Sequence, residues 1–297
     1  MIDALTGVLK RGIRRSRALT ELGQTLQFEF GHPPDGPVIL VHQMARVGSV
    51  AVLHALLKRF PRANVYHTHY LNPDTIHDYH ERFKELHRRT GQASLDREFI
   101  AARTLARRLR GPIGPWRVIS MVRDPVARTV SAFFRHFQLN HPELGPGYEA
   151  DPANVDRLLE LFLADDEHER QFTLGWFDRE IRDVFGIDVF GNEFPVDAGH
   201  AAYGDAKCSL LVVRTEDLAR TGGGAIASFL GVPELRIERE NASAHEPYAE
   251  AWSHFIDRIR IPDPYLDVMY GSRLARHFYT ASEIEAVRAR WSGADGV

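Results

Sequence analysis

A continuous apolar run that passes through a short glycine turn into a helix constrains the fold of this chain most. The run is Val38 to His42, the turn is QMARVGSV at residues 43–50, and the helix is expected from Ser49 to Phe60. A short apolar run preceded by turn residues is typical of a strand buried in a parallel sheet. The segment therefore predicts a βα unit.

The same alternation of strands and helices continues along the chain. Aspartate and proline at 124 and 125 fit the cap and first position of a helix. Ser282 and Glu285 fit a capping box near the C-terminus. This order predicts an α/β fold, in which helices flank a mostly parallel central sheet within a single domain. We expect further strands at 63–66, 116–122 and 209–213, and helices within 72–110 (two, broken near Gly91), after 124, at 169–185 and at 225–230.

Composition excludes some classes of protein. The formal net charge of −3 over 297 residues gives no electrostatic argument for a nucleic-acid partner. The single cysteine, Cys208, excludes an internal disulfide and fits a reducing, cytoplasmic compartment. No apolar segment approaches the length of a membrane span.

The N-terminal segment, residues 1–32, is expected to be a basic helix or tail before a domain at 33–297. Two interpretations stay open for it. A basic amphipathic helix could contact an anionic membrane surface peripherally, or the segment is a solvated helix or loose tail. Its basic residues are Lys10, Arg11, Arg14, Arg15 and Arg17.

The turn at residues 46–49 has the position of a phosphate loop. It lacks the first glycine and the Gly-Lys-Ser/Thr ending of an ATP-binding loop. Gly48 would let the backbone approach an anion, Ser49 would donate a hydroxyl hydrogen bond, and Arg46 adds a forked positive charge. The alternative is an ordinary βα turn.

A second strand-to-helix junction follows at residues 118–137. Arg123 leaves the strand beside the helix N-terminus, and Arg128, Ser131 and Arg135 share one stripe of the helix. A phosphate could bind there, or the arginines pair with carboxylates. Two such junctions suggest a ligand with two separated anionic groups. The stripe assigned to the core is Val126, Val130, Phe133 and Phe137.

At these residues the chain resembles sulfotransferases that use 3′-phosphoadenosine 5′-phosphosulfate (PAPS). The likeness is to glycan sulfotransferases of the heparan 2-O type and to bacterial proteins labelled as capsular polysaccharide synthesis proteins. Arg-Asp-Pro-Val-x-Arg-x-x-Ser at 123–131 is its most specific part, and it extends over roughly residues 38–291. Further matching segments lie at 176–178, 185–189, 214–218, 229–231 and 277–279.

This resemblance implies a P-loop-like sulfotransferase fold and transfer of a sulfuryl group from PAPS to a hydroxyl, expected on a saccharide or polysaccharide. Arg123 and Ser131 would hold the 3′-phosphate. The family usually has lysine at the position of Arg46. The alternative is a noncatalytic nucleotide-binding protein of the same fold acting in capsular polysaccharide assembly. The 5′-phosphosulfate would lie on Arg46, Val47, Gly48, Ser49 and Val50.

His67 and His69 follow the second strand at the carboxyl edge, where open α/β sheets bind ligands. The heparan 2-O type has a similar His-x-His, so we expect His69 to be the general base and His67 a second polar contact. There are two alternatives. The two histidines could form a metal site together with His77, Asp78 and His80, or they are only the polar end of a strand. No metal is expected, because fixed cations and amides can stabilise sulfuryl transfer.

Two other polar groups are set apart from the predicted site. The resemblance assigns Glu216 and Asp217 to a structural turn, a helix cap or a loop contact rather than to catalysis. It places Asn241, Ser243 and Tyr248 in a late loop that closes over the nucleotide, with a weak match.

Overall fold

The structure is a computed structural model that describes residues 17–31, 38–61, 63–90, 97–109, 115–164, 167–238 and 246–293. Within these residues five strands form one sheet in the order β2-β1-β3-β5-β4. β1 pairs in parallel with β2 and β3, β3 pairs in parallel with β5, and β4 lies antiparallel at the edge. The strands are β1 (Val38–His42), β2 (Asn64–Thr68), β3 (Trp116–Val122), β4 (His200–Gly204) and β5 (Cys208–Arg214).

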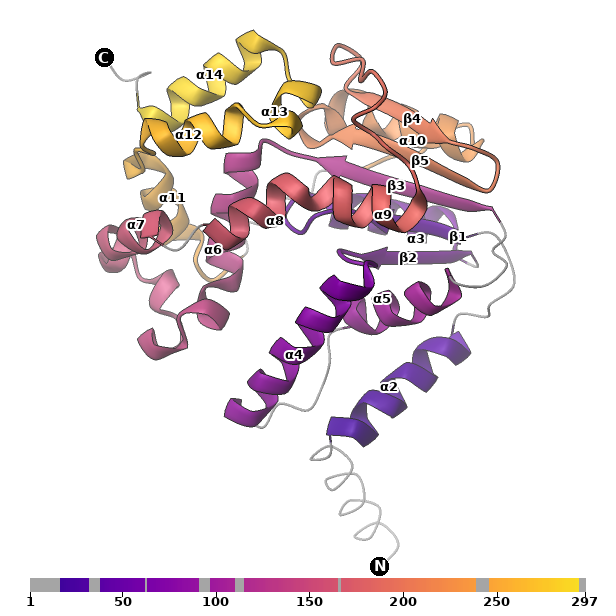
Figure 1. Cartoon of the computed structure of the whole chain (residues 1–297), viewed down its shortest axis with the longest axis horizontal. Coiled ribbons are helices and arrows are strands. Elements are labelled where there is room, and N and C mark those ends of the chain that lie inside the picture. Colours follow the sequence, from indigo (N-terminus) through magenta and orange to yellow (C-terminus); the bar gives the residue numbers. More distant parts are fainter. Residues whose placement is uncertain are drawn as a thin grey trace, which may run out of the picture.

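Helices flank this sheet, so the predicted α/β fold is confirmed. In Figure 1 the helices α6, α7 and α11 gather at one end of the sheet. The helices are α2 (Arg17–Gly31), α3 (Ser49–Arg59), α4 (Pro73–Thr90), α5 (Arg97–Arg108), α6 (Pro125–Asn140), α7 (Val155–Ala164), α8 (Glu167–Phe177), α9 (Asp183–Phe185), α10 (Gly223–Leu230), α11 (Ala249–Arg258), α12 (Asp263–Tyr270), α13 (Arg273–Phe278) and α14 (Ala281–Ser292).

Two clusters of buried apolar residues hold these elements together. The larger one surrounds the sheet and includes every residue of β1 except His42. The smaller one lies between α6, α7, α11 and α12. Val126, Val130 and Phe137 of α6 are fully buried in it, and Phe133 packs against it partly buried. The predicted core stripe of this helix is therefore confirmed.

The fold differs from the sequence-based expectation in several places. Helices α7, α11, α12 and α13 were not predicted, and β2 extends to Thr68, so His67 lies within this strand rather than after it. β4 was not predicted, because five residues that include two alanines show no apolar alternation. The predicted capping box at Ser282 and Glu285 is wrong: Thr280 caps α14 and pairs with Glu283. The same Ser/Thr-x-x-Glu spacing fits both positions, and helix α13, which ends at Phe278, decides where the next helix begins.

The structure describes only part of the N-terminal segment, residues 1–32, for which a basic helix or tail is predicted. Residues 1–16, which carry most of the basic cluster, and residues 32–37, at the predicted boundary, lie outside the described residues. Helix α2 packs against α5, and its Glu21 forms ion pairs with Arg103 and, at 3.5 Å, with His80. The boundary at residue 32 stays a prediction.

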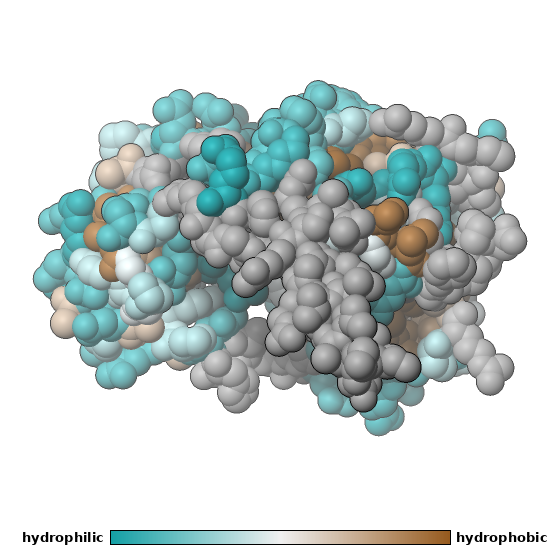
Figure 2. Space-filling view, turned by 90° about the horizontal axis from the view of Figure 1, so that it is seen from below, coloured by the Kyte–Doolittle hydropathy of each residue, from teal (hydrophilic) through white to brown (hydrophobic). Residues whose placement is uncertain are grey.

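The helices in the described part of the chain do not have the character of membrane-spanning helices. None of its helices combines the length and the apolar composition that crossing a bilayer requires. Seen from below, the coloured part of the surface is mostly hydrophilic, with separate apolar patches (Figure 2).

Candidate active site

The turn between β1 and α3 has an unusual backbone. Arg46 has a φ of 73° and is the one non-glycine residue with positive φ among those that the structure describes. Gly48, with a φ of 82°, caps α3, which begins at Ser49. A left-handed conformation costs a residue with a side chain roughly 1–2 kcal/mol, and such strain clusters at functional sites. The hydroxyl of Thr215 donates to the Val47 carbonyl at 2.7 Å and holds the turn from the end of β5.

The two predicted anion sites meet at this turn. Arg46 Nε donates to Ser131 Oγ at 2.9 Å, and Arg123 NH1 donates to the Arg46 carbonyl at 3.0 Å. The N-termini of α3 and α6, which favour anions, therefore lie beside two guanidinium groups. Tyr248 OH lies 3.5 Å from Arg46 NH2, and Glu246 Oε1 lies 3.9 Å from Arg46 NH1.

The other residues predicted to contact the nucleotide differ in their exposure to solvent. Gly48 is exposed, while Ser49 is buried at the first position of the helix. The Val47 side chain is fully buried, so only its backbone can reach a ligand. Val50 is 42% exposed, and Asn241 and Ser243 lie outside the described residues.

Arg128 does not belong to the anion-binding stripe. It is 1% exposed, and its Nε donates to the Ala45 carbonyl at 3.0 Å. Its NH1 donates to Thr173 Oγ1 at 2.9 Å and forms an ion pair with Glu169. Arg128 therefore links the turn to α8, in agreement with the alternative in which the arginine pairs with a carboxylate. Arg135 is largely exposed.

Two carboxylates, those of Asp124 and Glu216, lie near Arg123. Burial lowers the pKa of Arg123, and the nearby carboxylates of Glu216 and Asp124 oppose that shift. Glu216 accepts from the Asp124 backbone N–H at 2.8 Å and from the Tyr279 hydroxyl at 3.1 Å. Burial raises the pKa of Glu216. The expected structural role of Glu216 agrees with these contacts.

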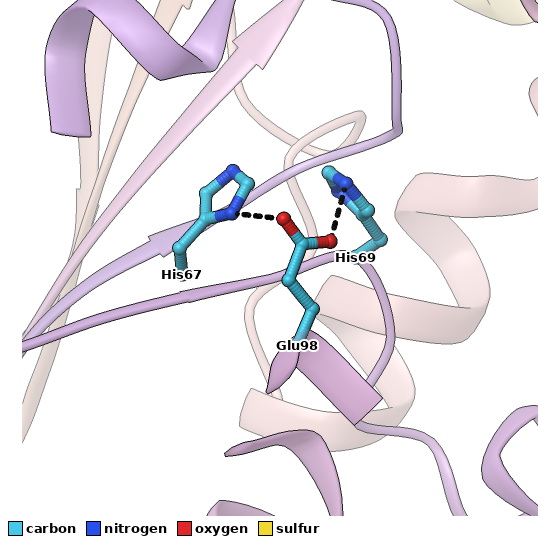
Figure 3. A group of neighbouring side chains, drawn as sticks. All are labelled: His67, His69 and Glu98. Carbon is cyan, nitrogen blue, oxygen red and sulfur yellow. Dashed lines mark ion pairs between the residues drawn. The ribbon is translucent and has the colours of Figure 1, made fainter. Parts of the chain in front are cut away.

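A carboxylate bridges the two predicted histidines. Glu98, in the first turn of α5, lies 2.7 Å from His67 Nδ1 and 2.9 Å from His69 Nε2 (Figure 3). Burial raises the pKa of Glu98, but the hydrogen bonds from His67 and His69 outweigh it and hold that pKa well below its usual range. Sequence reasoning missed Glu98, because no local pattern links α5 to the end of β2.

Hydrogen-bond partners give the two imidazoles different roles. His69 Nδ1 lies 2.9 Å from the Gln43 carbonyl and its Nε2 lies 2.9 Å from Glu98, so both its nitrogens face oxygen acceptors. His67 donates from Nδ1 to Glu98. Its Nε2 can then accept from Ser49 Oγ at 3.0 Å and from Gln43 Nε2 at 2.8 Å. His67, rather than His69, has the nitrogen lone pair that a general base needs.

The same three side chains have the composition of a metal site. Within the described residues, His67, His69 and Glu98 are the one group whose ligand atoms, all within 4.8 Å of one another, could hold an ion. Each of these atoms already has a hydrogen-bond partner at 2.7–2.9 Å, which accounts for the geometry without an ion. The predicted absence of a metal stays a prediction. His80, part of the sequence-based alternative, pairs with Glu21 instead.

Comparison with known proteins gives one family. Residues 155–280 match the model of the NKWYS family, described as "Putative capsular polysaccharide synthesis protein". The matched segment contains β5, Glu216 and Tyr248, whereas the β1 turn, the start of α6 and the histidines precede it. No curated protein and no solved structure matches the chain. The family points to capsular polysaccharide synthesis and names no reaction.

Proposed function

We propose that this protein transfers a sulfuryl group from PAPS to a hydroxyl group of a saccharide during capsular polysaccharide synthesis. The observation that carries the proposal is the convergence of Arg46, Arg123 and Ser131 at the carboxyl ends of β1 and β3. PAPS carries a 5′-phosphosulfate and a 3′-phosphate. Each of these two anionic groups would lie at the N-terminus of a different helix. The match to a capsular polysaccharide synthesis family supports a saccharide acceptor.

On the donor side, the amides that follow Gly48 would hold the 5′-phosphosulfate, and the hydroxyl of Ser49 would turn from His67 Nε2 to donate to it. Arg46 would stabilise the charge that develops as the sulfuryl group departs. Arg123 and Ser131 would hold the 3′-phosphate. Because these groups provide a fixed positive field, we propose that the donor side works without a metal ion.

On the acceptor side, we propose His67 as the general base, which reverses the roles that the sequence suggested for His67 and His69. His67 Nε2 lies 3.0 Å from the hydroxyl of Ser49, the residue that opens α3. The acceptor hydroxyl would therefore approach the base next to the sulfuryl group. A positioned base typically contributes about 10²- to 10⁴-fold in rate.

Nucleotide binding tests the proposal most directly. 3′-Phosphoadenosine 5′-phosphate (PAP) should bind much more tightly than adenosine 5′-phosphate in calorimetric titration. Arg123→Ala should weaken PAP binding at least tenfold, because a lost charge-assisted hydrogen bond costs about 1.5–3 kcal/mol.

Arg117→Ala is the matched control for this experiment. Arg117 lies on β3, the strand that ends one residue before Arg123, and donates to Ser209 at 3.0 Å on the exposed surface. Its loss should leave PAP affinity unchanged. Equal affinity of the wild type for the two nucleotides would contradict the assignment of the 3′-phosphate site.

Arg46 itself favours a second candidate, a noncatalytic nucleotide-binding protein of the same fold. Its guanidinium stands where the sulfotransferases usually have lysine, and it donates to Ser131 rather than facing open solvent. Wild-type protein that binds PAP but transfers no radiolabelled sulfate from PAPS to any saccharide would favour this candidate. Activity that Arg46→Lys retains and Arg46→Ala loses would favour the enzyme.

A further inference from the structure

Glu98 lies beside the proposed base, in contact with it. It lies in the first turn of α5, where the next two residues, Phe99 and Ile100, are 0% and 4% exposed in the main core. Its two carboxylate oxygens each contact a different imidazole (Figure 3). A buried helix start therefore fixes the position of an acceptor between His67 and His69.

A carboxylate at this place selects the tautomer of His67. A neutral imidazole has one N–H donor and one acceptor nitrogen. Because Glu98 only accepts when ionised, Nδ1 of His67 must carry the proton at their 2.7 Å contact. Nε2 is then the nitrogen with the lone pair, and it faces Ser49.

We propose that Glu98 is the positioning residue of the base: it holds His67 in the Nδ1–H tautomer, with Nε2 directed at the phosphate loop. This inference rests on the proposed sulfuryl transfer. In that step the acceptor O–H bond breaks and its proton goes to His67 Nε2. The acceptor oxygen bonds to sulfur, and the sulfur–oxygen bond to the departing PAP breaks with its electron pair. Glu98 then faces the imidazolium and stabilises it.

His69 completes this arrangement from the other side. Its Nδ1 lies 2.9 Å from the Gln43 carbonyl and its Nε2 lies 2.9 Å from Glu98. The Trp176 indole N–H donates to the His69 carbonyl at 3.0 Å and fixes the backbone there. We therefore assign His69 to holding the carboxylate of Glu98 in place.

Kinetics of Glu98 variants test the proposal. Glu98→Ala should lower kcat at least tenfold while the KM for PAPS and the Kd for PAP change less than about twofold, because the base lies on the acceptor side. Glu98→Gln should retain intermediate activity, since its amide oxygen can still accept from His67 Nδ1 and its NH2 can donate to His69 Nε2. A fall in PAP affinity that matches the fall in kcat would overturn the proposal.

Nitrogen NMR of the imidazoles gives a readout that needs no sulfotransferase activity. Wild-type His67 should show a protonated Nδ1 and an unprotonated Nε2, and Glu98→Ala should shift it toward the other tautomer. An unchanged tautomer would overturn the proposal even if sulfuryl transfer is found. A changed tautomer would uphold the positioning by Glu98 even if the transferred group differs.

Two further measurements complete the test. Glu81→Ala, which removes an exposed carboxylate paired with Lys84 on α4, should alter neither kcat nor the tautomer. Purified wild type should contain no stoichiometric metal. One zinc or other divalent ion per chain, lost in Glu98→Ala, would overturn the proposal, because the ring nitrogens would then be ligands.

Discussion

At the scale of single residues, the backbone of Arg46 carries the clearest mark of function. An arginine has no steric reason to occupy a left-handed conformation that glycine adopts freely. In this conformation the Arg46 guanidinium donates to Ser131 and the Arg46 carbonyl accepts from Arg123, so the two junctions meet at this residue.

This interpretation predicts a stability difference between two variants that both lose the guanidinium. Arg46→Gly should be about 1 kcal/mol more stable than Arg46→Ala, because alanine keeps the left-handed strain and glycine relieves it. Urea denaturation of the two proteins measures the difference. Alanine equal to or more stable than glycine would show that position 46 is not strained.

At the scale of elements, Asp124 connects helix α6 to helices α12 and α14. Its side chain accepts from the Val126 backbone N–H at 3.0 Å, which caps α6. It also accepts from the Tyr270 hydroxyl of α12 at 2.9 Å and from the Trp291 indole of α14 at 3.0 Å. One carboxylate thus joins the C-terminal helices to the end of β3, where the proposed 3′-phosphate site lies.

We expect Asp124→Ala to lower the free energy of unfolding by about 3–7 kcal/mol. The loss of a cap costs about 1 kcal/mol, and each buried donor left without a partner costs about 1–3 kcal/mol. Asp124→Asn keeps an acceptor oxygen for the cap and should cost clearly less.

Asp151→Ala is a suitable control, measured by the same urea titration. Asp151 also accepts from a backbone N–H, that of Ala153 at 2.9 Å, but it is exposed and caps only a short turn. Its replacement should cost no more than about 1 kcal/mol. Similar losses in Asp124→Ala and Asp151→Ala would show that Asp124 acts only as a cap.

At the scale of the whole molecule, acid stability should depend on Glu98. Burial raises the pKa of this carboxyl, but its hydrogen bonds with the two histidines lower it overall in the folded protein. Below the ordinary glutamate pKa the unfolded chain binds a proton that folded Glu98 does not. The stabilisation is therefore complete above that pKa and is lost as the pH falls.

The expected measurement is the slope of unfolding free energy against pH between about pH 5 and 3. The slope should be steeper in the wild type than in Glu98→Gln, by up to about 1.4 kcal/mol per pH unit for one proton. Glu81→Gln, at an exposed position, serves as the comparison. Parallel curves for wild type and Glu98→Gln would contradict the low pKa of Glu98.

Local chemistry in the sequence determined most of the elements and the place of the proposed anion site. The apolar runs of β1, β3 and β5 and the Asp-Pro start of α6 are signals carried by neighbouring residues, and the structure agrees with each. Because parallel strands align their carboxyl ends, the same signals predict that Arg46, Arg123 and Ser131 lie at one edge of the sheet.

Only the tertiary structure decided which side chains meet across elements. Arg128 shares a stripe with Ser131 in the sequence, yet the packing of α8 against α6 turns it to Glu169. Glu98 reaches His67 because α5 packs beside β2, a contact that no spacing along the chain encodes. Periodicity specifies which face of a helix is buried, whereas the identity of a partner depends on how helices and strands pack together. The sequence therefore indicated where the site lies, and the packing determined which histidine has the lone pair.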